Sequence, residues 1–191
     1  MSPEYQRSVF LLNQLVFISC LVNFAGFILY FSQDLFISAL VNLLTGTVFS
    51  FIIYLNRLKK YRAARMLWVA NVNLYIITIN IAEGFGAGED LLFFPAFISI
   101  TFIIRINSNY KDLVFTYIIT GLSAFICLWF IPYETQFQLI SPATAHRIYN
   151  SCLVICMIVT IFVSFIVLRT GKYKETLILE EKISWRSFTI P

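Results

Sequence analysis

Five polar side chains, in two separate parts of the chain, could together bind a small ligand. Asn80 and Glu83 lie at the end of one apolar segment, and His146, Tyr149 and Asn150 lie at the start of another. Amides and carboxylates can hydrogen-bond a ligand, and an imidazole titrates near neutral pH. We therefore expect these five residues to line a pocket. The simpler alternatives are hydrogen bonds between helices for the asparagines and an ordinary interfacial side chain for the histidine.

A second group of small and polar residues lies inside the apolar segments, where a polar side chain is costly unless it faces protein or water. Ser38, Asn42, Gly46 and Ser50 recur every four residues along one segment, and Asn73 lies in the next. Residues four apart share one face of a helix. Small side chains let helices approach closely in a membrane, and amides can hydrogen-bond between them. The pattern predicts helix packing, with a polar path for a solute as the alternative.

The sequence lacks the motifs that are typical of enzymes and metal sites. It contains no HExxH motif, and the glycines of the stretch EGFGAGED are not followed by the Lys-Ser/Thr pair of a phosphate-binding loop. All four cysteines lie inside apolar segments, which favours packing over disulfides or zinc ligation. We therefore expect no enzymatic activity, no cofactor and no metal site.

The elements that position these side chains are six apolar segments. Hydrophobic residues make up 59% of the 191 residues and charged residues 13%, which is outside the range of soluble domains. Backbone groups in lipid must be paired within their own segment, so long apolar runs become helices. The sequence predicts an all-α, polytopic six-helix transmembrane bundle. Its spans are about 9–31, 35–55, 66–82, 91–104, 113–132 and 148–168.

Two of these spans are shorter than the roughly 20 residues that cross a bilayer. They are 66–82 and 91–104, and they flank the glycine-rich turn Glu83–Asp90. We interpret them as a helical hairpin that could extend a turn into this loop. Residues 133–147 form the longest connection of the predicted bundle.

The basic residues indicate how the bundle is oriented. With a cytoplasmic N-terminus, 13 of the 14 Lys and Arg residues fall on the cytoplasmic side, and only Arg147 lies outside. Basic loops remain in the cytoplasm. The sequence therefore predicts a multi-pass protein of a bacterial inner membrane with both termini cytoplasmic. Because the positive net charge follows from topology, it gives no reason to expect a nucleic-acid partner.

The sequence predicts one membrane domain, residues 1–168, followed by a cytoplasmic tail, residues 169–191. Within this tail, residues 172–183 favour an amphipathic helix, and the last eight residues lose that pattern. We expect Lys172, Leu177 and Ile183 to belong to a helix that relays a signal, and parallel pairing of this helix would allow a homodimer.

The chain resembles the six-helix N-terminal membrane region of bacterial sensor histidine kinases, a region also fused to cyclase or transcription-regulator outputs. The resemblance rests on the basic loop Asn56–Arg65, the stretch IAEGFGAGED followed by LLFFPAF, the polar positions in the third and sixth segments, and the charged stretch Arg169–Lys182. It implies a sensor that passes a helix displacement to a cytoplasmic effector. Neither a phosphoacceptor histidine nor ATP-binding glycine motifs follow the sixth segment, so kinase activity is not implied for this chain.

The expected function is a membrane-embedded sensory input module, acting through a cytoplasmic effector domain or partner protein. A small ligand would bind near the outer face and shift the sixth helix. The alternatives are a channel or transporter for a small solute and a non-catalytic structural membrane subunit. Whether the chain is a truncated input domain or a stand-alone protein is left open, as is the identity of the ligand.

Overall fold

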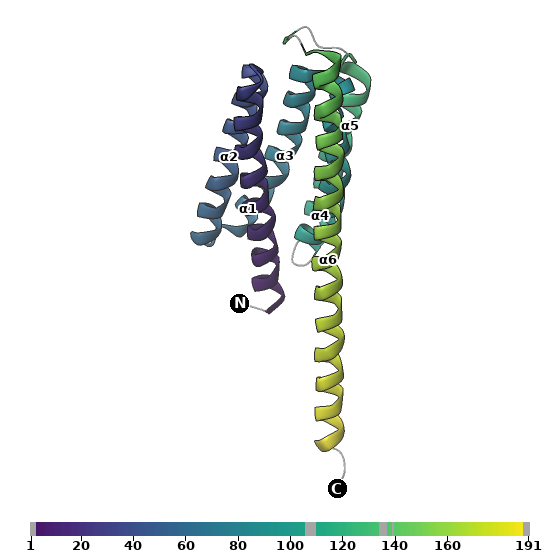
Figure 1. The fold of residues 1–191 in the computed structure, drawn as a ribbon. Coiled ribbons are helices and arrows are strands. Elements are labelled where there is room, and N and C mark those ends of the chain that lie inside the picture. The colour runs from purple at the N-terminus through teal and green to yellow at the C-terminus, as the bar shows by residue number, and fades with distance from the viewer. Residues whose placement is uncertain (1–2, 106–109, 134–136, 139, 189–191) are drawn as a thin grey trace.

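The computed structural model describes residues 3–105, 110–133, 137–138 and 140–188, and these residues form helices without a β-strand. The order of elements is α1 (Pro3–Ser32), α2 (Phe36–Arg57), α3 (Tyr61–Glu83), the short 3-10 helices η1 (Phe85–Ala87) and η2 (Glu89–Leu92), α4 (Phe93–Arg105), α5 (Tyr110–Phe130) and α6 (Pro142–Phe188). Successive long helices run in opposite directions (Figure 1). The first turn of α1 and the last turn of α6 therefore lie toward the same end of the molecule.

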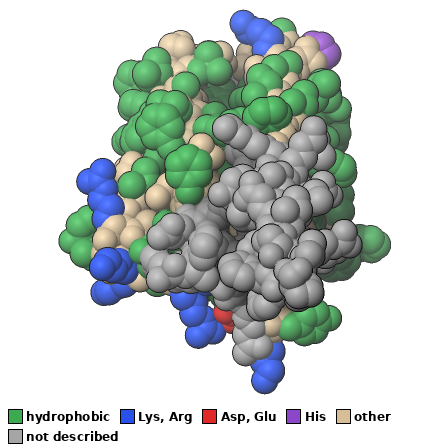
Figure 2. Space-filling view, turned by 90° about the horizontal axis from the view of Figure 1, so that it is seen from below, with side chains coloured by type: hydrophobic (Ala, Val, Ile, Leu, Met, Phe, Trp, Pro, Cys, Tyr) green, Lys and Arg blue, Asp and Glu red, His purple; other side chains and the backbone are tan. Residues whose placement is uncertain are grey.

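The two ends of the bundle differ in charge. At one end the α2–α3 connection carries exposed Arg57, Lys59, Lys60 and Arg62; we call it the basic end. The opposite end, the acidic end, holds Asp34, Glu83, Glu89 and Asp90. Figure 2 views the molecule from the basic end and shows Lys and Arg side chains gathered along one part of this face, with hydrophobic side chains around them.

Five helices are long and apolar enough to cross a membrane, among the residues that the structure describes: α1, α2, α3, α5 and the first part of α6, up to Phe165. The prediction of an all-helical chain with long apolar helices is thus confirmed. Helix α2 covers Phe36–Arg57, which agrees with the predicted span 35–55 to within a few residues. Large apolar side chains such as Phe17, Leu44 and Leu128 face outward, at 57%, 58% and 65% exposure. Such faces suit contact with lipid.

The segment predicted as the fourth span differs from the other five. We expected its helix to extend into the loop. The structure has the 3-10 helix η2 at that place, and α4 itself has 13 residues. Thirteen residues rise about 20 Å, less than the hydrocarbon thickness of about 30 Å. Pro95 is the third residue of α4, in the first turn, where its missing N–H breaks no helical hydrogen bond.

Helix α6 begins earlier and ends later than the sequence predicted. Its first residue is Pro142, within the predicted connection 133–147, and its last is Phe188. Ser141 caps this start, because its Oγ accepts a hydrogen bond from the Thr144 N–H at 3.2 Å. Ser before Pro is a usual helix start, so this signal was present in the sequence. The 47 residues of α6 span about 70 Å, and the C-terminal part extends beyond the other helices (Figure 1).

Candidate functional site

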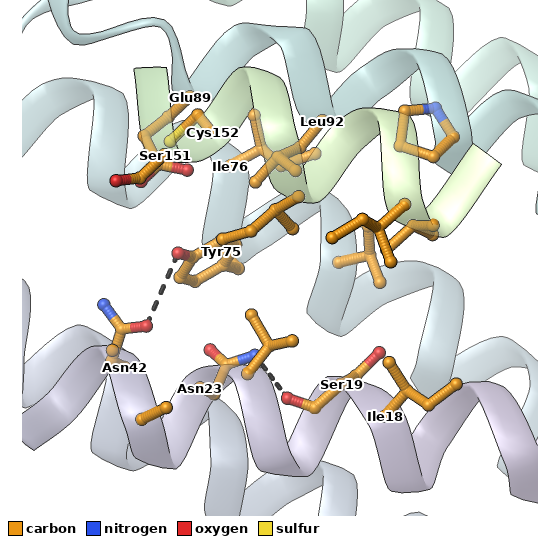
Figure 3. Close-up of a pocket in the computed structure, with 18 of the residues that line it drawn as sticks. Ile18, Ser19, Asn23, Asn42, Tyr75, Ile76, Glu89, Leu92, Ser151 and Cys152 are labelled. Atoms are coloured by element: carbon orange, nitrogen blue, oxygen red, sulfur yellow. Dashed lines mark hydrogen bonds between the residues drawn. The ribbon is translucent and has the colours of Figure 1, made fainter. Parts of the chain in front are cut away.

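A large, partly open cavity lies between α1, α2, α3, η2, α4 and α6. Its volume is about 1120 Å³, enough for a drug-sized molecule. Its polar lining includes Asn23, Asn42, Tyr75, Glu89 and Ser151. Figure 3 shows Glu89, Ser151, Tyr75 and Asn42 toward one end of the cavity and Ile18 and Leu92 further along it. The cavity therefore has a polar region near the acidic end and an apolar region deeper in the bundle.

The five residues predicted to form a ligand pocket are not brought together around this cavity. Asn150 lines it. Glu83 is buried close by, whereas Asn80 is fully buried and donates from Nδ2 to the Ile76 carbonyl at 2.8 Å. Tyr149 packs against the glycine-rich loop, and His146 lies exposed on α6. Among the five, the structure places Asn150 on the cavity and Glu83 beside it.

The glycine-rich loop turns the chain inward at the acidic end. Gly84 and Gly88 have positive φ angles of 83° and 81°, which glycine adopts at little cost. At Gly88 a Cβ atom would also lie 2.4 Å from Cδ2 of Tyr149. The backbone N–H groups of Phe85 and Gly86 donate to the carbonyls of Pro132 and Tyr133, both at 3.1 Å. This docking places Glu89, the residue after Gly88, inside the bundle.

Two buried carboxyl groups meet at the hydroxyl of Tyr30. The Oη of Tyr30 lies 2.9 Å from Oε1 of Glu89 and 3.4 Å from Oε2 of Glu83. Exposure is 5% for Glu83 and 2% for Glu89. The phenol has one proton to donate, and the shorter distance favours Glu89. This cluster joins α1, α3 and η2 at the acidic end.

Glu89 has one oxygen available to a ligand. Its Oε2 has no hydrogen-bond partner among the described residues, and Cys152 of α6 lies beside it (Figure 3). Burial raises the pKa of Glu89 above its ordinary value, hydrogen bonds from the Cys152 thiol and the Tyr30 hydroxyl lower it, and the charge of Asp90 raises it. Because an unpaired buried carboxylate costs several kcal/mol, this group is stable only if it is protonated or paired with a cation.

Asn42, one of the predicted packing residues, forms the other side of the polar region. The Tyr75 hydroxyl donates to Oδ1 of Asn42 at 3.5 Å (Figure 3), and Nδ2 of Asn42 donates to the Ser38 carbonyl at 2.9 Å. Gly26 of α1 leaves room for this amide, since a Cβ atom there would lie 2.6 Å from Oδ1 of Asn42. Asn42 thus serves both the α1–α2 contact and the cavity wall.

The other predicted packing residues lie at helix contacts away from the polar region. The Cys20 thiol of α1 lies 3.7 Å from the Gly46 carbonyl and 3.6 Å from the Ser50 hydroxyl of α2. Asn73 of α3 donates to the Thr120 hydroxyl of α5 at 3.1 Å. The side chains of Lys172, Leu177 and Ile183, predicted to relay a signal, lie outside the described residues.

Several residues of the site were missed from the sequence, namely Asn23, Tyr30, Tyr75 and Glu89. Tyr30 and Glu89 are 59 positions apart, so no local spacing reveals their contact. The sequence feature that could have indicated this contact is the pair of loop glycines, Gly84 and Gly88, because glycine allows the chain to fold back into the bundle.

A metal centre is not indicated, since the described residues contain no group of three or more His, Cys, Asp or Glu side chains that could hold an ion. Comparison with protein-family models and with curated proteins finds no match to this chain.

Proposed function

We propose that this chain is a membrane-embedded input module, in which a small ligand bound in the cavity changes the position of α6. The observation that carries the proposal is the double role of this helix. Residues of α6 from Arg147 to Phe162 line the cavity, and the same helix continues to Phe188. The part after Phe165 is about 35 Å long. A shift at the cavity wall would therefore be carried to the opposite end of the molecule.

The proposed setting is a bacterial inner membrane crossed six times, with both termini cytoplasmic. The exposed basic residues Arg57, Lys59, Lys60 and Arg62 of the α2–α3 connection support this orientation. In this setting residues 91–104 form the fourth, short pass. The polar region of the cavity lies toward the periplasmic side, and the end of α6 faces a cytoplasmic effector or a second copy of the chain.

Ligand binding would act by population shift. A ligand changes the balance of two packings of α6 only by as much as its affinities for the two packings differ. A tenfold preference changes the ratio of the two states tenfold, or about 1.4 kcal/mol. Side chains of α6 on the wall, such as Ser151 and Ile155, would provide that difference.

The proposal is tested with the full chain in lipid nanodiscs. Thermal-shift screening of small metabolites identifies stabilising compounds. Spin labels at Lys59→Cys and Lys172→Cys then report the distance between the α2–α3 connection and α6. We expect a stabilising compound to change this distance distribution in the wild type and not in Asn42→Leu. Gly121→Ala, where an added Cβ meets nothing within 4 Å, is the matched control and should respond as the wild type does.

Two results would overturn the proposal. Compounds that stabilise the protein but leave the label distance unchanged would show that binding is not coupled to α6. Saturable uptake of such a compound into proteoliposomes, abolished by Asn42→Leu, would instead identify a transporter. The polar lining of the cavity is the observation that favours this second function.

A further inference from the structure

The polar region of the cavity has an excess of hydrogen-bond acceptors. Three buried oxygens on the cavity lining lack a hydrogen-bond donor in good geometry among the described residues: Asn23 Oδ1, Gln33 Oε1 and Glu89 Oε2. The Cys152 thiol beside Glu89 is a weak donor to its carboxyl group. Asn23 uses its amide nitrogen on the Ser19 carbonyl of its own helix, at 2.8 Å, which leaves its oxygen for another group. A buried acceptor without a donor costs about 1–3 kcal/mol. A ligand that donates several hydrogen bonds would remove this cost.

The charge of the region favours a cation. Glu89 contributes a carboxyl group, and the second carboxyl, Glu83, lies on the other side of the Tyr30 hydroxyl. The basic side chain on the cavity lining, Arg147, is exposed and donates at 3.4 Å to the Ala143 carbonyl and at 3.4 Å to the Thr144 hydroxyl of its own helix. It is therefore directed along α6. A positively charged donor would stabilise the ionised form of Glu89.

The remainder of the cavity fits an apolar body attached to that cation. Deeper lining residues include Leu15, Phe49, Trp68 and Phe162. The rings of Tyr30 and Tyr75 also line the polar region, and aromatic faces attract organic cations. An inorganic ion would fill neither the apolar region nor a volume of about 1120 Å³.

We propose that the cavity binds an amphipathic organic cation, whose ammonium N–H groups donate to Glu89 and whose apolar body lies between α1 and α6. This inference rests on the proposed function, because it names the ligand class of the same cavity. The ammonium could belong to a free amine or to an aminolipid, since both present the same N–H donors.

Three probes of similar shape test the chemistry: 2-phenylethylamine, 2-phenylethanol and the trimethylated ammonium analogue. Each is titrated into the full chain in phosphatidylcholine nanodiscs at mildly alkaline pH. The readouts are the thermal midpoint and the tryptophan fluorescence, to which Trp68 of the cavity lining contributes. We expect the amine to bind at least tenfold more tightly than the alcohol, which lacks the charge. It should also bind more tightly than the trimethylated cation, which has no N–H to donate. Equal affinities for amine and alcohol would overturn the proposal.

Variants locate the binding. We expect Glu89→Gln to weaken amine binding at least tenfold and to leave alcohol binding nearly unchanged. Asp34→Asn, which removes an exposed carboxylate of the acidic end outside the cavity lining, is the matched control and should bind as the wild type does. Glu89→Asp is a second variant, expected to weaken amine binding more than alcohol binding, because the shorter side chain holds its carboxylate farther from the ammonium. Amine affinity unchanged in whichever of Glu89→Gln and Glu89→Asp folds would contradict the assignment.

Two further experiments distinguish a free amine from an aminolipid as the ligand, and the proposed ligand class from the proposed function. Competition against the amine by nanodiscs that contain phosphatidylethanolamine would identify an aminolipid, and undiminished binding there would identify a free amine. If another compound moves the spin labels while amines do not bind, the ligand class is wrong and the input module stands. If amines bind without moving α6, the ligand class stands and the proposed function fails.

Discussion

Tyr30 and Glu89 determine the chemistry of the cavity at the level of single residues. The phenol of Tyr30 donates to Glu89 at 2.9 Å, and the other carboxyl oxygen of Glu89 is left for a ligand. The side chains that act on Glu89 come from several elements: Tyr30 from α1, Glu83 and Tyr75 from α3, Asp90 from η2 and Cys152 from α6.

This arrangement predicts that stability falls as the pH rises. Burial raises the pKa of Glu89 from its ordinary value of 4.5. Between the two values the folded state holds a proton that the unfolded state has released, so the free energy of unfolding decreases with increasing pH. We expect Glu89→Gln to reduce this slope above about pH 5, measured as thermal midpoints in one detergent. Asp34→Asn should keep the wild-type slope, and a slope unchanged in Glu89→Gln would contradict the assignment.

At the scale of elements, polar side chains join α3 and α5. The buried residues of α5 are Thr116, Thr120, Ser123 and Cys127, a set that follows the helical repeat. Thr120 accepts a hydrogen bond from Asn73 of α3 at 3.1 Å. The ion pair of Arg62 and Asp112, at 2.9 Å, joins the starts of the same two helices. Because Arg62 is largely exposed, this ion pair contributes little to stability.

A double-mutant cycle measures the Asn73–Thr120 contact. We expect Asn73→Ala and Thr120→Val to show a coupling of about 0.6 kcal/mol in the free energy of unfolding, the usual size of such hydrogen bonds in membrane proteins. The cycle of Asn73→Ala with Thr47→Val is the control. Thr47 is exposed and donates to the Leu43 carbonyl of its own helix, so its coupling should be near zero. Equal coupling in both cycles would mean that the α3–α5 hydrogen bond contributes nothing specific.

At the scale of the whole molecule, the alternating helix directions place the α1–α2 turn and the α2–α3 connection at opposite ends (Figure 1). Asp34 and Lys59 occupy these two turns. Both are exposed, and their φ angles are closely matched at 58° and 59°. They are therefore equivalent positions for labels on the two sides of a membrane.

The proposed orientation predicts the outcome of labelling in intact cells. A membrane-impermeant maleimide should modify Asp34→Cys directly and Lys59→Cys only after permeabilisation, because the basic connection faces the cytoplasm. The wild type, in which Cys20, Cys127 and Cys152 are buried and Cys156 is half-buried, is the background control. Labelling of Lys59→Cys from outside would reverse the orientation and move the cavity to the cytoplasmic side.

The sequence by itself determined the class of fold and the course of the helices. Apolar length and composition decide which segments can lie in a hydrocarbon solvent, and backbone pairing in lipid makes them helices. These are local properties, so α2 and α5 could be assigned to within a few residues. Local periodicity also indicated the stripe of Ser38, Asn42, Gly46 and Ser50, of which the first three lie buried and Ser50 is exposed.

Only the tertiary structure decided which polar groups meet. The sequence placed Glu89 in an outer loop and grouped Asn80, His146 and Tyr149 into a pocket, because closeness to a segment end was the only guide. The fold instead turns the loop inward at Gly88 and brings Glu89 to Tyr30, 59 positions away. Contacts over such separations depend on how six helical segments pack together, and no repeat within one segment encodes them.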